Sequence, residues 1–96
     1  MDIIDQLCDV VWGDDGIISY MRYGDGGWED LKPEVISLAE KIRDMYVSSE
    51  VIPTKLARLL IDTVSEFANY QHRCEPYADL RLEFRKALGD LGKVWD

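Results

Sequence analysis

The chain of 96 residues has 19 acidic and 11 basic side chains, which give a formal net charge of −8 at pH 7. This charge would repel phosphate groups, so it argues against direct binding to nucleic acid or to an anionic membrane surface. A chain of this length predicts a single helical domain, residues 1–96, whose core is too shallow for a deep substrate cavity.

Residues Asp2–Trp12 place apolar side chains at helical spacing, with acids on the opposite face. Asp2 stands where an N-cap carboxylate stabilises the first turn, and Gly13 is expected to end the helix. Acids also occupy the positions where a signal peptide needs basic residues, and no apolar run is long enough to span a bilayer. These two observations predict a cytoplasmic location.

Residues 13–32 are rich in Gly and Asp and permit two interpretations. A short helix can run from Gly16 to Tyr23, or the β-forming residues within it can form a strand. A lone strand would have no partner elsewhere in the chain. We therefore expect the helix, which Gly24 would end and which a glycine-rich turn would follow.

Long apolar stripes predict two further helices. The first begins at Pro33, which suits the first helical turn, and ends near Val47. The second begins at Pro53 and ends near His72. Their expected core residues are Val35, Leu38, Ala39, Ile42, Met45 and Tyr46 in the first helix and Leu56, Leu59, Leu60, Thr63, Val64 and Phe67 in the second.

A last helix is predicted from Tyr77 to Val94, weakened by Gly89 and Gly92 and anchored by Trp95. Because the loops between the last three helices are short, neighbouring helices must run antiparallel. The sequence therefore predicts an all-α fold. It is a small antiparallel bundle of four to five helices, with the irregular Gly/Asp-rich segment between the first and the third.

No motif in the chain predicts catalysis or a metal site. His72 and Cys74 are close in sequence, but no third group stands nearby to orient the histidine. One histidine and two cysteines cannot supply a closed zinc site, and the Gly/Asp-rich segment lacks the alternating donors of a calcium loop. We expect no enzymatic activity, no metal and no cofactor, and we expect Cys8 and Cys74 to be buried and reduced.

The acidic charge is concentrated at the front of the chain. Residues 1–34 hold nine carboxylates and two basic side chains, a net charge of −7, whereas residues 35–96 are nearly balanced at −1. The same third contains four large aromatic residues, of which the first is expected to pack inward: Trp12, Tyr20, Tyr23 and Trp28. Acids mixed with amphipathic rings are typical of a surface that binds a basic protein.

The predicted partner-binding residues are the acids and rings of this third, namely Asp14, Asp15, Tyr20, Tyr23, Asp25, Trp28, Glu29 and Asp30. The acids would steer a basic partner into place, and the three rings would fill the central contact. The alternative is a solvated acidic face whose rings belong to the core.

In size, acidity and predicted helicity the chain resembles bacterial immunity proteins that neutralise nuclease toxins, and phage-encoded inhibitors of host defence complexes. The resemblance implies a small inhibitor that blocks a basic, nucleic-acid-acting partner without chemistry of its own. An immunity protein, or antitoxin, is the first hypothesis. An anti-CRISPR-type inhibitor or nucleic-acid mimic is the alternative.

A hypothesis from another class is a helical adaptor or oligomerisation module. Such a protein would use an apolar stripe left over after the core is filled, through Ala57, Ile61 and Tyr70. A homodimer would be one form of it. Binding that resists added salt would favour this class, whereas an inhibitor of a basic partner should associate more slowly as salt is added.

Overall fold

The computed structural model describes residues 2–24, 26–49, 51–72, 75–89 and 91. All regular structure in this part of the chain is helical, and the predicted all-α bundle is confirmed. The five described α-helices are α1 (Ile3–Trp12), α2 (Ile17–Tyr23), α3 (Trp28–Tyr46), α4 (Thr54–Tyr70) and α5 (Glu75–Leu88).

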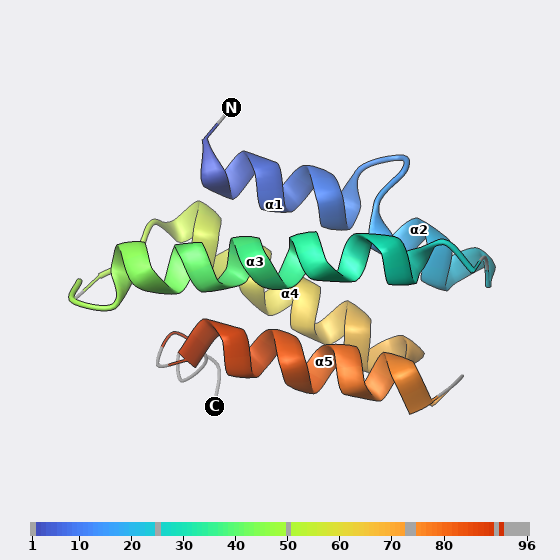
Figure 1. Ribbon diagram of the computed structural model, residues 1–96. Coiled ribbons are helices and arrows are strands. Elements are labelled where there is room, and N and C mark those ends of the chain that lie inside the picture. The colour runs from blue at the N-terminus through green and yellow to red at the C-terminus, as the bar shows by residue number, and fades with distance from the viewer. Residues whose placement is uncertain (1, 25, 50, 73–74, 90, 92–96) are drawn as a thin grey trace.

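The helix α3 is the central element of the bundle. It lies side by side with α5 on the near face in Figure 1 and also packs against α1, while α4 lies behind them and packs against α5. The helices α3, α4 and α5 alternate in direction, as their short connections require. The starts of α3 and α5 therefore lie at the same end of the molecule, where α2 contacts α1, α3 and α4.

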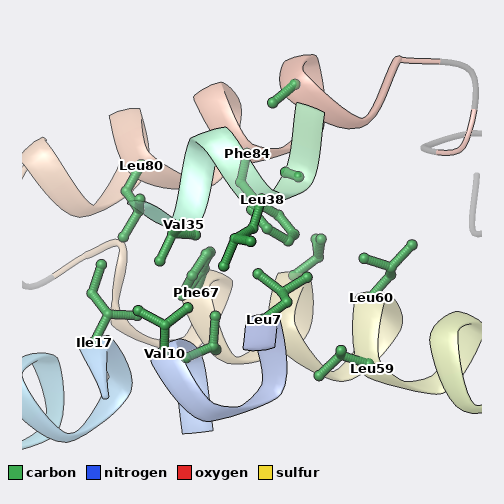
Figure 2. Close-up of a cluster of buried hydrophobic side chains, with 14 of the residues drawn as sticks. Leu7, Val10, Ile17, Val35, Leu38, Leu59, Leu60, Phe67, Leu80 and Phe84 are labelled. Atoms are coloured by element: carbon green, nitrogen blue, oxygen red, sulfur yellow. The ribbon is translucent and has the colours of Figure 1, made fainter. Parts of the chain in front are cut away.

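One hydrophobic core joins all five helices, and Figure 2 shows their side chains converging on it. Phe67 of α4 and Phe84 of α5 meet edge to face within it, with ring centroids 5.5 Å apart. Every predicted core position of α4 is buried. In the last turn of α3, Tyr46 packs against the core as predicted. Met45, predicted for the same apolar stripe, is exposed.

The helix α1 begins as predicted. The Asp2 side chain accepts a hydrogen bond from the backbone N–H of Asp5 at 2.8 Å, and this bond lowers the pKa of the Asp2 carboxyl. The Asp5 carboxylate in turn accepts a hydrogen bond from Lys55 of α4, which raises the pKa of that lysine. The capped start of α1 is thus tied to the start of α4.

The helix α3 begins at Trp28, five residues before the predicted start at Pro33. The apolar stripe explains the difference, because Trp28 and Leu31 continue the spacing of the later core residues. Burying a tryptophan of roughly 200 Å² contributes about 5 kcal/mol, whereas a proline inside a helix costs about 3 kcal/mol. Pro33 lies on the exposed face of α3, and its lack of an N–H leaves the Glu29 carbonyl without its helical donor.

The last two helices end earlier than predicted. The helix α4 stops at Tyr70 instead of His72, and α5 stops at Leu88 because Gly89 adopts a left-handed backbone with φ 57°. Val94 and Trp95, predicted to continue and anchor the last helix, lie outside the described residues. None of the described helices combines the length and apolar character that a bilayer span requires.

Candidate partner-binding surface

The turn between α1 and α2 holds Asp14 and Asp15 at the surface. Two glycines make this turn tight. A Cβ atom on Gly13 would lie 2.4 Å from a carbonyl oxygen of α1, and one on Gly16 would lie 2.6 Å from another. The Gly16 amide donates to the Gly13 carbonyl at 2.9 Å. The backbone of α1 and of the turn thus fixes where the two acids stand.

Gly16→Ala is expected to lower the free energy of unfolding by about 1–3 kcal/mol, because the added methyl group would press on backbone that cannot move aside cheaply. Gly26→Ala is the matched control, since a Cβ atom there would meet nothing within 4 Å. The control should change stability by less than about 0.5 kcal/mol. Urea denaturation followed by circular dichroism measures both, and equal stability of the two variants would contradict the close approach at Gly16.

The residues 17–23 form the predicted short helix, α2, and not a strand. Ile17, Ile18 and Met21 bury one face of α2, and Gly24 ends it with φ 73°. From this helix the Arg22 Nε–H donates to the hydroxyl of Tyr70 in α4 at 3.2 Å. This hydrogen bond raises the pKa of Arg22, and the guanidinium also lies 3.8 Å from the Glu66 carboxylate.

The second basic residue among positions 1–34, Lys32, also pairs with an acid that is distant in the sequence. The Lys32 ammonium of α3 lies 2.5 Å from the Glu83 carboxylate of α5. Arg22 and Lys32 are the only basic residues among positions 1–34, and both pair with acids from the rest of the chain. Among the described residues, no ion pair joins either of them to a carboxylate of positions 1–34.

We call five exposed carboxylates at one end of the bundle the acidic end: Asp14, Asp15, Glu29, Asp30 and Glu75. The turn after α1 and the first turns of α3 and α5 all lie at this end in Figure 1. Within the described residues, none of the five carboxylates has a hydrogen-bond partner or an ion-pair partner on another side chain. Asp25, also predicted for this surface, lies outside the described residues.

Three acids of the acidic end also have a local structural role. Glu29 and Asp30 stand in the first turn of α3, and Glu75 stands in the first turn of α5. Gly27, the N-cap of α3, offers no side-chain cap, so Glu29 and Asp30 are the groups whose negative charge offsets the positive end of the α3 dipole, as Glu75 does for α5. Such a partial charge cannot cancel a full carboxylate charge, and the end stays negative.

The three predicted contact rings have three different environments. Tyr23 is 75% exposed at the end of α2. Tyr20 is half-buried with its ring against Gly27, where a Cβ atom would approach it to 2.7 Å. Trp28 is only 6% exposed and packs edge to face on Tyr77 of α5, with ring centroids 5.2 Å apart. Trp28 is thus a core residue, and its prediction as a surface anchor was wrong.

Two side chains expected inside the protein reach the surface. Trp12 is 36% exposed, because its Nε1–H donates to the Thr63 hydroxyl at 3.0 Å and so holds the ring at the edge of the core. Cys8 lies on the exposed face of α1, while Cys74 falls outside the described residues. The stripe proposed for an adaptor is broken in turn, because Tyr70 is buried and bound by Arg22.

Comparisons with protein family models, with curated proteins and with solved structures give no match for this chain. In the described part of the chain, no three His, Cys, Asp or Glu side chains converge in a way that could hold a metal ion. The acidic end thus combines exposed negative charge on a fixed turn with exposed carboxylates on two helix starts.

Proposed function

We propose that this protein is an inhibitor that binds a basic, nucleic-acid-acting protein through its acidic end. One observation carries the proposal: among the described residues, the five exposed carboxylates of the acidic end have no basic side chain paired with them, while the nearby Lys32 pairs with Glu83. Clustered surface charge of one sign accelerates the encounter with a partner of opposite sign and helps to exclude other partners.

Tyr23 would supply the contact once the partner has arrived. An exposed tyrosine brings a large, rigid area and a hydroxyl group at low cost in conformational entropy, which is why tyrosines are frequent at interface hot spots. Tyr23 stands at the end of α2, five residues before the start of α3 with its Glu29 and Asp30, which suits a contact close to negative charge. Inhibition would come from covering the partner's phosphate-binding surface.

A nuclease toxin is the partner that we propose first, which would make the protein an immunity protein. Nucleases carry basic grooves for phosphates, and a compact acidic end suits a cap that binds one toxin molecule. An inhibitor of a CRISPR-type complex would meet a similar basic groove. The two differ in what the partner does, so the partner's activity distinguishes them.

Affinity capture tests this proposal. Three proteins are immobilised separately and exposed to extract from the native cells: the parent, an acidic-end variant and a control variant. The acidic-end variant carries Asp14→Asn, Asp15→Asn and Asp30→Asn. The control variant has the same change in charge elsewhere, through Glu40→Gln, Asp44→Asn and Asp62→Asn. We expect a basic protein to bind the parent and the control, to bind the acidic-end variant far less, and to be released by salt. One equivalent of the parent should abolish its nuclease activity.

Two results would contradict the proposal. In one, both variants capture the same proteins as the parent, which would mean that the acidic end is only a solvated face. In the other, the captured protein keeps its full nuclease and nucleic-acid-binding activities when it is saturated with the parent. Loss of nucleic-acid binding by a partner without nuclease activity would instead identify the CRISPR-type alternative.

A further inference from the structure

A groove of about 790 Å³ runs between α3 and α5, and Glu29 of the acidic end is among its lining residues. Pro33 and Ile36 of α3 and Ala87 of α5 give it apolar walls. Its charged lining is balanced, with three carboxylates and three basic groups: Glu29, Glu40, Glu83, Lys32, Arg43 and Lys86. In a chain with a net charge of −8, this is a face that a second acidic molecule can approach without strong repulsion.

The charges of α3 along this groove are self-complementary. Ile36 stands midway between Glu29 and Arg43, seven residues from each, and midway between Lys32 and Glu40, four residues from each. All five line the groove, as residues at such helical spacing on one face of α3 can. If a second α3 lay antiparallel with its Ile36 opposite the first, each acid would face a base.

We propose that two copies of this protein form a two-fold dimer in which each α3 lies antiparallel in the groove of the other, with Ile36 at the axis. A two-fold interface uses the same patch on both copies, so it must be complementary to itself, and this patch meets that condition. The symmetry would create four ion pairs, namely Glu29 with the partner's Arg43 twice and Lys32 with the partner's Glu40 twice.

The existing contacts of these side chains allow the new pairs. Lys32 lies 2.5 Å from Glu83, and its ammonium has three donors, so it can bind a second carboxylate. Arg43 contacts the exposed Asp44 at 3.1 Å and has further N–H donors. The side chains of Lys32 and Arg43 are only half-buried. Since the two α3 helices would be antiparallel, the two acidic ends would point in opposite directions. The dimer would engage Glu29 of each acidic end and leave Asp14, Asp15 and Tyr23 free.

Charge exchange tests the dimer without any other protein. The parent is expected to show twice its 11.1 kDa mass in sedimentation equilibrium at high micromolar concentration. Glu29→Arg alone, or Arg43→Glu alone, places like charges opposite each other twice and should weaken the dimer by about tenfold or more. The double variant Glu29→Arg/Arg43→Glu restores opposite charges and should recover the parent's dimer within about threefold.

Glu34→Arg and Lys41→Glu are the matched controls, because both residues are exposed on α3 and neither lines the groove. They should leave the dimer as it is in the parent. A cysteine at Ile36, in a chain whose native cysteines are replaced by Ser, should form a disulfide with its copy across the axis. A monomeric parent, or a double variant no better than the single ones, would overturn the proposal and leave the proposed inhibitor function untouched.

Discussion

Trp28→Ala is expected to lower the free energy of unfolding by about 3–5 kcal/mol, which is a large share of the 5–15 kcal/mol typical of a small domain. The ring is 6% exposed and contacts Tyr77 of α5, so its removal leaves a cavity between α3 and α5. It also removes the burial that holds the first turn of α3 ahead of Pro33. Urea denaturation gives the stability, and far-ultraviolet circular dichroism should show a loss of helix.

Tyr23→Ala is the control for the stability loss expected of Trp28→Ala. Tyr23 is 75% exposed, so its truncation should change stability by less than about 0.5 kcal/mol. If Tyr23 is the central contact of the acidic end, the same change should cost about 2 kcal/mol or more of partner binding. A Trp28→Ala protein as stable as the parent would contradict the placement of Trp28 in the core.

The second large effect is expected in the rate of association with the captured partner. The acidic-end variant, with Asp14, Asp15 and Asp30 changed to Asn, should associate about tenfold more slowly than the parent at low salt. Its dissociation rate should change less, because steering charges at a rim act mainly before contact. Stopped-flow mixing or surface plasmon resonance measures both rates. A variant that only dissociates faster would show that these acids are contacts and do not steer.

The helices could largely be predicted from the sequence, because their signal is local. The apolar stripes of α4 and α5 repeat at helical spacing, and the same residues form the core in the structure. The start of α3 was missed because Pro33 is a strong local signal for a first turn, while the burial of Trp28 against Tyr77 depends on a helix almost fifty residues later. The spacing of Trp28 and Leu31 does continue the apolar stripe, but only the tertiary contact shows that this stripe outweighs the proline signal.

The sequence shows most of the acids of the candidate surface, but not which acids lie together in space or which basic side chains pair elsewhere. Glu75 was overlooked because it stands far from residues 1–34, although antiparallel packing of three successive helices brings the starts of α3 and α5 to one end. The pairing of Arg22 with Glu66, and of Lys32 with Glu83, joins residues 44 and 51 positions apart. Composition gave no sign of which charges would be neutralised.

The dependence of the association rate on ionic strength tests most directly whether free charge at the acidic end attracts the partner. For the parent and for the control variant with Glu40, Asp44 and Asp62 changed, we predict a rate that falls steeply as salt is added. For the acidic-end variant we predict a slow rate that salt barely alters. Equal salt dependence in the two variants would mean that net charge alone drives association and that the acidic end has no special part in it.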